Sequence, residues 1–297
     1  MELLISPVGK RQLLTEIQKL PDSDLLMRRG HFEVYLSQLG DRPTLLREIG
    51  RLREETFRSV GEGTGKALDI DEFDRYYHNL FIWDRQAGRI VGGYRMGPGR
   101  EIVRRRGPEQ FYLHSLFDVH PAAQPLLAQS VELGRSYIVE DYQRGYLPFF
   151  LLWRGILCFL LQHPEYRYLI GPVSISKYYS GRSKSLIVAF VKRYFFDDQW
   201  AAYFHPRQPF EPDLATGDLE HLLDRLQGDR LADLENLLDT IEPDHLKVPV
   251  LLKQYTKLNA RFISFNIDPK FSDALDGLML LDLKNLPPET LRLLNEK

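Results

Sequence analysis

The chain has 297 residues, a formal net charge of −2 and a single cysteine, and 43% of its residues are hydrophobic. A chain of this length can bury a full hydrophobic core, whereas a near-neutral charge argues against nucleic-acid binding through bulk positive charge. One cysteine permits no internal disulfide and no cysteine-based zinc site, and residues 1–14 lack the apolar core of a secretory signal. We therefore expect a globular, cytoplasmic protein that binds no nucleic acid.

Helical and strand-like patterns follow one another along the chain. Residues 1–30 and 43–57 have the apolar spacing of amphipathic helices. A turn at residues 85–88 separates two strand-like runs. In chain order, the strand-like or short apolar segments are residues 79–84, 89–95, 110–119, 131–139, 168–175, 186–191 and parts of 248–297. The pattern predicts an α/β (α+β) fold in which helices pack on a mixed sheet.

The most apolar run covers residues 147–161 and carries Arg154 at its centre. It is shorter than the roughly 20 apolar residues that a membrane-spanning helix needs. An arginine at mid-bilayer also costs about 2.5–3.5 kcal/mol on insertion scales. The run therefore predicts a helix that is buried in protein, with docking on a bilayer surface as the alternative.

Residues 211–245 differ in composition from the rest of the chain. Leucines at helical spacing lie on both sides of Gly228, and Pro212 and Pro243 bound the segment. This pattern predicts an αα-hairpin with an acidic outer face. We expect residues 1–297 to form a single domain in which residues 211–245 are a helical-hairpin insertion.

The sequence lacks the motifs of several catalytic classes. It has no HExxH motif, no carboxylate–histidine spacing typical of a metal site and no G-x-S-x-G motif. Cys158 falls within the apolar run, where a thiol stays protonated and unreactive. We therefore expect no metal centre, no tightly bound cofactor and no serine or cysteine nucleophile.

Two groups of charged residues qualify as site candidates. Asp71, Asp74 and His78 precede a strand whose partner strand ends in Arg95, and together they form an ion-pair network or a pocket for a substrate amine. A basic cluster, Arg100 with Arg104, Arg105 and Arg106, follows in an otherwise neutral chain. It is either a solvated loop or a docking surface for an acidic partner.

Glu132 is the third candidate, because it interrupts an apolar strand pattern. Strict alternation would place Glu132, Gly134 and Ser136 on one face and the intervening residues, Arg135 among them, on the other. A mid-strand carboxylate beside a glycine suits a polar cleft that a substrate backbone approaches closely. The alternative is a glutamate that pairs with an arginine on an ordinary sheet face.

Taken together, these segments resemble a known family. The pattern resembles that shared by acyl-homoserine-lactone synthases and by the N-acyltransferases that make ornithine and glycine lipids, both in the GCN5-related N-acetyltransferase (GNAT) superfamily. The C-terminal run is similar to the lipid-forming group. The segments that carry the resemblance are Arg53 to Phe57, Asp71-x-Phe73-Asp74, residues 79–96, Glu132-x-x-Arg135-Ser136-Tyr137-Ile138-Val139 and residues 249–283.

The resemblance implies a fold, a reaction and partners. The fold would be a splayed, mixed central sheet with flanking helices. The donor would be a 3-hydroxyacyl group on the phosphopantetheine of acyl carrier protein, and the acceptor the α-amine of an amino acid, of glycine or ornithine type. The product would be an aminolipid precursor that a separate O-acyltransferase completes, because no His is followed by Asp after four residues. Peripheral contact with the inner membrane is then expected.

The resemblance also implies roles for single residues. Glu132 matches the family's glutamate and would act as general base, a role worth about 10²–10⁴-fold in rate. Arg135, with Ser136, would order the cleft or bind a carboxylate. Substrate-binding residues would be Asp71, Asp74, His78 and Arg95, and the rim for the acidic carrier protein would be Arg104, Arg105, Arg106 and Arg144.

One departure and two alternatives stand beside this interpretation. Acetyltransferases that use coenzyme A cradle its pyrophosphate with a glycine-rich turn, whereas residues 143–148 have one glycine and Pro148, which lacks an N–H. This difference favours a carrier-protein donor. The first alternative is an autoinducer-type synthase that makes a homoserine lactone from S-adenosylmethionine. The second is a non-catalytic acyl- or carrier-binding module of the same fold.

Overall fold

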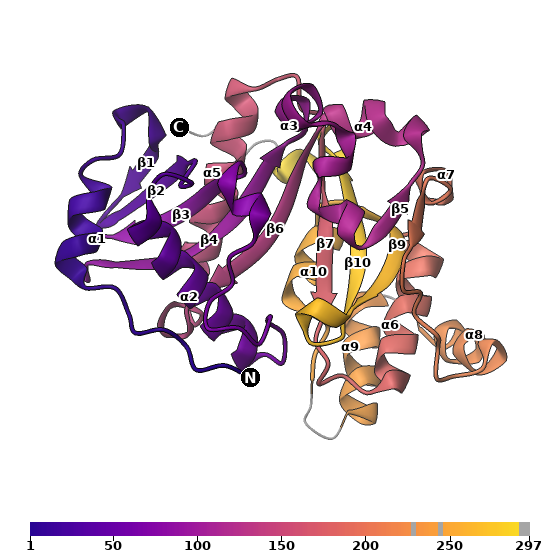
Figure 1. Ribbon diagram of the computed structural model, residues 1–297. Helices are drawn as coiled ribbons and strands as arrows, with labels where there is room; N and C mark the ends of the chain where they lie inside the picture. The colour runs from indigo at the N-terminus through magenta and orange to yellow at the C-terminus, as the bar shows by residue number, and fades with distance from the viewer. Residues whose placement is uncertain (227–229, 243–245, 291–297) are drawn as a thin grey trace. The chain divides into compact units, whose positions relative to one another are not determined.

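The computed structural model describes residues 1–226, 230–242 and 246–290, and the chain divides into two compact units (Figure 1). Unit 1 joins residues 1–112 to residues 127–167. Unit 2 joins residues 113–126 to the chain from residue 168 onward. Each unit contains its own strands and helices.

The sheet of unit 1 has the strand order β1-β2-β3-β4-β6, and each neighbouring pair is antiparallel. The β3–β4 turn closes on Asp84, whose carboxylate accepts hydrogen bonds from the backbone N–H groups of Gln86 and Ala87 at 2.8 Å each. Gly88 follows with a φ of 65°, a conformation that glycine adopts without strain. The strands are β1 (Leu25–Arg29), β2 (Phe32–Ser37), β3 (His78–Asp84), β4 (Arg89–Pro98) and β6 (Ser130–Ile138).

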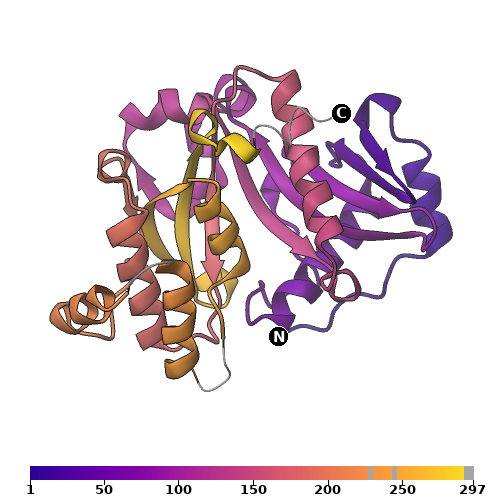
Figure 2. The same cartoon turned by 180° about the vertical axis from the view of Figure 1, so that it is seen from behind.

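Helices cover both faces of this sheet. Helix α5 (Tyr146–Gln162) brings Gly155 against one face, where a Cβ on Gly155 would lie 2.7 Å from Leu80 and 3.0 Å from Val34. Figures 1 and 2 show α5 and helix α2 on opposite faces of these strands. The remaining helices of unit 1 are α1 (Lys10–Ile17), α2 (Pro43–Ser59), α3 (Gly99–Arg106) and the 3₁₀ turns η1 (Asp22–Asp24), η2 (Glu72–Arg75), η3 (Pro108–Gln110) and η6 (Glu140–Tyr142).

Unit 2 is built on three antiparallel strands in the order β7-β10-β9, and on a short antiparallel pair, β5 with β8. The strands are β5 (Phe117–Val119), β7 (Tyr168–Ile175), β8 (Phe204–Pro206), β9 (Arg261–Asp268) and β10 (Ala274–Asp282). Its helices are α6 (Gly181–Tyr194), α7 (Asp198–Ala201), α8 (Thr216–Asp224), α9 (Arg230–Ile241), α10 (Val250–Lys257) and the 3₁₀ turns η5 (Pro121–Ala123), η7 (Pro269–Phe271) and η8 (Leu283–Asn285). Two short elements, η4 (Tyr112–Ser115) and α4 (Gln124–Ala128), lie where the chain passes between the units.

The predicted fold class and most predicted strands are confirmed. Residues 79–84, 89–95 and 131–139 correspond to β3, β4 and β6, and the strand-like parts of 248–297 are β9 and β10. Within residues 1–30 the structure has one helix, α1, followed by strand β1 rather than a second long helix.

The predicted strand at residues 110–119 is wrong over most of its length. The chain makes two 3₁₀ turns there, and strand geometry is limited to Phe117–Val119. The backbone N–H of Tyr112 donates to side-chain oxygens of Tyr77 and Glu132 instead of to a neighbouring strand. Tertiary contacts therefore override the extended pattern of this segment.

Both helices of the predicted hairpin, α8 and α9, are present. Leu219 and Leu223 of α8 and Leu234 and Leu238 of α9 are buried, as the leucine spacing predicts. Gly228 and Pro243 lie outside the described residues. One domain over residues 1–297, with residues 211–245 as an insertion, stays a prediction.

Candidate active site

Strand β6 contains a β-bulge where its pairing with β4 shifts register. Between Gly134 and Tyr137, the two residues Arg135 and Ser136 lie opposite a single residue of β4. Arg135 adopts a φ of 51°, in the left-handed region that non-glycine residues rarely occupy. A bulge of this kind re-aims the side chains that follow it and is frequent beside active sites.

The prediction that Arg135 lies on the opposite face of the sheet from Glu132 is wrong, because the bulge breaks the strict alternation of side chains. The Glu132 carboxylate accepts a hydrogen bond from the backbone N–H of Tyr112 at 3.0 Å. The guanidinium carbon of Arg135 lies 4.9 Å from the centroid of the Tyr112 ring. Glu132 and Arg135 therefore meet the same residue, whereas alternation would separate them across the sheet.

Glu132 is 1% exposed and is held by two donors. The Tyr77 hydroxyl donates to Glu132 Oε2, and the backbone N–H of Tyr112 donates to the same Oε2 atom and to the Tyr77 hydroxyl oxygen, at 3.0 Å each. Burial and the neighbouring Glu132 carboxylate raise the pKa of Tyr77 well above its usual value, so the hydroxyl stays a neutral donor. Glu132 thus has a fixed orientation in a site from which bulk water is excluded.

Gly97 makes room for this arrangement. It lies opposite Glu132 in the β4–β6 pairing, and a Cβ at this position would lie 2.3 Å from the ring of Tyr77. Real Cβ atoms essentially never approach another heavy atom so closely. A glycine at position 97 is therefore required for Tyr77 to lie over β4 and reach Glu132.

An ion-pair network lies beside Glu132. Arg53 of α2 contacts Asp74 at 2.8 Å and Asp69 at 3.1 Å, and all three side chains are almost fully buried. Burial alone would raise the pKa of Asp69 and Asp74, but the surrounding guanidinium groups outweigh it and lower the pKa of both carboxyls. The members of the network are Arg53, Asp69, Asp71, Asp74, Arg95 and Arg135.

Arg95 and Arg135 complete the network from the sheet. Arg95 contacts Asp71 at 2.6 Å and Asp74 at 3.4 Å, and Arg135 contacts Asp69 at 2.9 Å and Asp71 at 3.6 Å. With 26% of its side chain exposed, Asp71 is the most exposed of the network's aspartates.

Local hydrogen bonds explain why Asp71 and Asp74 act together. The Asp71 carboxylate accepts from the Phe73 N–H at 3.0 Å, and Asp74 accepts from the Asp71 N–H at 2.9 Å. This reciprocal capping box begins η2. It presents both carboxylates to Arg95, which also packs against the rings of Phe73 and Tyr112 at 5.5 and 5.2 Å.

Comparison with known proteins shows the family of the chain. An Acetyltransferase (GNAT) domain profile matches residues 52–153. A curated glycine N(alpha)-acyltransferase of Phocaeicola vulgatus is 32% identical over 234 residues, which are 75% of this chain and 71% of that protein. Another, from Bacteroides thetaiotaomicron, is 33% identical over 209 residues, which are 66% of this chain and 61% of that protein. The chain belongs to the GNAT acyltransferases.

Solved structures also resemble this GNAT acyltransferase. The coenzyme A-dependent acyl-homoserine lactone synthase MesI is 14% identical, covers 88% of this chain and 92% of its own, and has a TM-score of 0.40. The coenzyme A-dependent acyl-homoserine lactone synthase BjaI is 14% identical, covers 89% of this chain and 88% of its own, and has a TM-score of 0.38. The profile match at residues 52–153 contains Glu132 and the entire ion-pair network.

Not every predicted site residue of this acyltransferase joins the site. Asp71, Asp74 and Arg95 do, but His78 lies on the α5 side of the sheet, with the ring of Phe159 6.4 Å away. Its Nε2 atom is 3.1 Å from Gln38 Nε2, and burial lowers its pKa. His78 is separated from Arg95 because Asn79, the next residue, is the one that pairs with it.

The predicted basic rim is also divided. Arg104, Arg105 and Arg106 are exposed at the end of α3, which follows the last residue of β4. Arg144 is exposed just after β6, and the two strands are antiparallel. The two basic groups therefore lie at opposite ends of this strand pair.

Four residues of the site were not assigned to it from sequence. Tyr77 and Tyr112 contact Glu132, and Arg53 and Asp69 belong to the ion-pair network. Asp69 could have been found from the sequence, because it is a third aspartate only two positions before Asp71. Nothing in the sequence indicates a donor role for Tyr112, because the donor is its backbone N–H.

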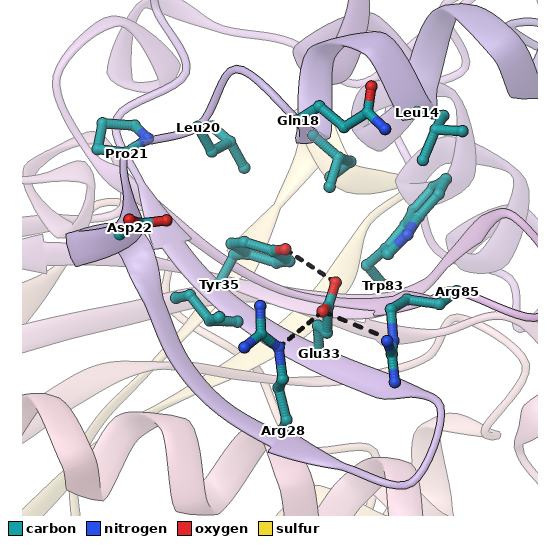
Figure 3. A pocket seen from close by; sticks show the side chains of 12 residues that line it. Leu14, Gln18, Leu20, Pro21, Asp22, Arg28, Glu33, Tyr35, Trp83 and Arg85 are labelled. Carbon is teal, nitrogen blue, oxygen red and sulfur yellow. Dashed lines mark hydrogen bonds and ion pairs between the residues drawn. The ribbon is translucent and has the colours of Figure 1, made fainter.

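A separate pocket of about 330 Å³ lies between α1, η1 and strands β1 to β3 (Figure 3). Its buried Glu33 accepts hydrogen bonds from the Tyr35 hydroxyl at 2.8 Å and Arg28 Nε at 2.9 Å, with Arg85 Nε at 3.6 Å. Trp83, the cross-strand neighbour of Glu33, and the side chains of Leu14 and Leu20 supply the apolar part of the lining. None of the predicted site residues lines this pocket, so Glu33 is a buried carboxylate independent of Glu132.

Proposed function

We propose that this acyltransferase moves a 3-hydroxyacyl group from acyl carrier protein to the α-amine of an amino acid, with glycine as the first candidate acceptor. The observation that carries the proposal is Glu132, a buried carboxylate oriented by two donors on a bulged strand. The names of the two curated relatives, both glycine N(alpha)-acyltransferases, support glycine as the acceptor.

The reaction requires one proton to leave the amine before attack and one afterwards. A free α-amine is mostly protonated at neutral pH, and Glu132 accepts its proton directly or through a water molecule. The amine nitrogen then forms a bond to the thioester carbonyl carbon, and the carbon–sulfur bond breaks. The second proton leaves the nitrogen as the amide forms, and the phosphopantetheine sulfur takes up a proton as it departs.

The negative charge on the carbonyl oxygen during attack needs fixed donors. We assign this role to backbone N–H groups of β6 at the bulge, where Arg135 and Ser136 interrupt the pairing with β4. A preorganised donor of this kind is worth about 10²–10³-fold in rate. Ser136, half-buried at the bulge, would line the same position.

The ion-pair network would position the acceptor. Asp71 is the partly exposed aspartate, and its carboxylate is anchored by Arg95 and Arg135. We assign contact with the acceptor ammonium group to Asp71, because an anchored and accessible carboxylate binds a cation with little loss of side-chain entropy. Asp74 and Arg95 would act by holding Asp71 in place.

The donor and the fate of the product follow from two further features. Residues 143–148 precede and begin α5 with Gly145 and Pro148, which offer fewer N–H groups than a pyrophosphate cradle needs. This favours phosphopantetheine on acyl carrier protein over coenzyme A. The product would be an N-acyl amino acid, and a separate O-acyltransferase would carry out the second acylation of aminolipid synthesis.

Mass spectrometry of a defined reaction tests the proposal. The purified full chain is incubated with 3-hydroxyacyl carrier protein or the matching acyl-coenzyme A, together with glycine, ornithine, serine, lysine and S-adenosylmethionine. We expect N-acylglycine from the carrier-bound donor, and a decrease of about 10²-fold or more in Glu132→Gln.

Glu33→Gln is the matched control, because Glu33 is also a buried carboxylate that accepts from a tyrosine hydroxyl in the same sheet. It should keep its activity. An acyl-homoserine lactone as the main product would assign the autoinducer reaction instead. Carrier binding without product from any acceptor would assign a non-catalytic module.

A further inference from the structure

Helix α5 carries an aromatic and cationic stripe on its outer face. Tyr146, Phe149, Phe150 and Trp153 follow the i, i+3, i+4, i+7 spacing that aligns side chains on one side of a helix. Neighbouring rings in the stripe lie 6.1 to 6.4 Å apart. We call these four residues, with Arg29, Arg144 and Arg154, the α5 outer face.

The opposite side of α5 already forms the core contact. Leu151, Leu152 and Ile156 are fully buried, and Gly155 packs against the sheet. By contrast, 70% of Tyr146 is exposed, and Phe149, Phe150 and Trp153 are half-buried. The prediction of a helix buried in protein therefore holds for one side of α5 and is wrong for its outer face. Figure 2 shows α5 in front of the strands of unit 1.

The outer face is also positively charged. The guanidinium carbons of Arg29 and Arg154 lie 5.2 and 5.9 Å from the centroid of the Phe150 ring, and Arg144 is exposed two residues before α5 begins. Residues 144–163 contain no aspartate or glutamate. A solvated helix normally places mixed charges on its outer side, so an aromatic face with arginines alone requires another explanation.

We propose that the α5 outer face docks on the surface of a bilayer that contains anionic lipids. Tyrosine and tryptophan prefer the headgroup level of a membrane, where an apolar ring and a polar tip are both satisfied. Arginines beside them can rest their stems on apolar surface while their guanidinium groups meet lipid phosphates. The helix then lies in the plane of the interface.

The length of the helix agrees with surface docking rather than insertion. Helix α5 has 17 residues, and among the described residues no helix is both long and apolar enough to cross a membrane. The α5 outer face lies on the side of the unit 1 sheet away from α2 and Arg53. The proposed docking does not depend on the proposed reaction, and its test needs no substrate.

Vesicle flotation tests the docking. The purified full chain is mixed with phosphatidylcholine vesicles, with or without about 30% phosphatidylglycerol, at low and at high salt. We expect binding to the anionic vesicles, and salt should weaken it. Arg144→Glu should reduce the binding constant by at least roughly fivefold, since an arginine near an anionic surface contributes about that much.

Aromatic variants distinguish docking through the α5 outer face from non-specific membrane binding. Combining Tyr146→Ser with Trp153→Ser should abolish flotation with the anionic vesicles. Tyr178→Ser is the matched control, because Tyr178 is 57% exposed in unit 2 and outside the α5 outer face. Brominated acyl chains should quench the fluorescence of the wild type but not that of Trp153→Phe, which should still bind. Circular dichroism of each variant checks that it is folded.

Four results would overturn the docking. The first is equal binding to neutral and anionic vesicles, and the second is unchanged binding in the double aromatic variant. The third is a dimer, detected by sedimentation velocity, that dissociates in that variant, which would assign the face to contact between two copies of the chain. The fourth is unchanged vesicle binding in Arg144→Glu together with a weaker affinity for acyl carrier protein, which would assign Arg144 to carrier binding.

Discussion

Substitution of Tyr77 by phenylalanine removes one hydroxyl and leaves the ring that packs over Gly97. Glu132 loses one donor but keeps the backbone N–H of Tyr112 at 3.0 Å. A hydrogen bond to a charged group contributes about 1.5–3 kcal/mol. If all of it holds Glu132 in its reactive position, kcat falls by roughly 10- to 150-fold. The acid limb of the pH profile should also move to higher pH, because the charged carboxylate loses a donor.

Steady-state kinetics over a range of pH measure the fall in kcat and the shift of the acid limb. Urea unfolding of the same samples measures the free energy of unfolding. Tyr35→Phe is the matched control, because the Tyr35 hydroxyl donates to buried Glu33 in the same sheet but outside the site. Both variants should lose a similar free energy of unfolding, whereas activity should fall in Tyr77→Phe alone. If Tyr77→Phe is folded and retains wild-type kcat, or if Tyr35→Phe loses as much activity, the positioning role of Tyr77 is refuted.

Three further predictions concern the same site. Gly97→Ala should lower the free energy of unfolding by about 1–3 kcal/mol, because its Cβ displaces the Tyr77 ring, and urea unfolding should show no loss if the ring can move freely. The pKa of Asp69 and Asp74 is lowered in the folded chain, so the unfolded chain binds more protons. The stabilisation of the folded chain by these two carboxylates is therefore present above about pH 4, and it is lost as the pH falls toward their pKa values in the folded state. Urea titrations between pH 6 and pH 3 should show this loss, and an equally steep loss in Asp74→Asn would contradict it. Asp71→Asn should raise KM for the amino-acid acceptor more than it lowers kcat, and a selective effect on the acyl-donor KM would count against the assigned contact.

The ion-pair network explains why so many charges can be buried beside Glu132. Burying a single arginine such as Arg53 is costly, and removing one partner of a buried pair typically costs about 3–5 kcal/mol. Here each guanidinium group meets two aspartates, and each aspartate meets two guanidinium groups. Arg135 is held through this network, and it fixes the bulge that follows Glu132.

The sequence by itself determined the features that depend on near neighbours. Short continuous apolar runs, Leu80 to Trp83 and Ile90 with Val91, mark β3 and β4, and the Asp84 carboxylate and Gly88 close the turn between them. The spacing of Asp71 and Asp74 is that of a capping box, which forms within four residues. Glu132 was identifiable because a carboxylate inside an apolar strand pattern requires a buried partner.

Tertiary structure decided which of these residues meet. The bulge at Arg135 arises from the register between β4 and β6, and a period-two pattern carries no information about an extra residue. The contact between Asp69 and Arg135 joins positions 66 residues apart, and Tyr112 reaches Glu132 through its backbone. His78 is one residue from the strand position that faces Arg95, and alternation alone moves it to the other side of the sheet. Local patterns therefore set the chemistry of the side chains, whereas strand register and burial set their partners.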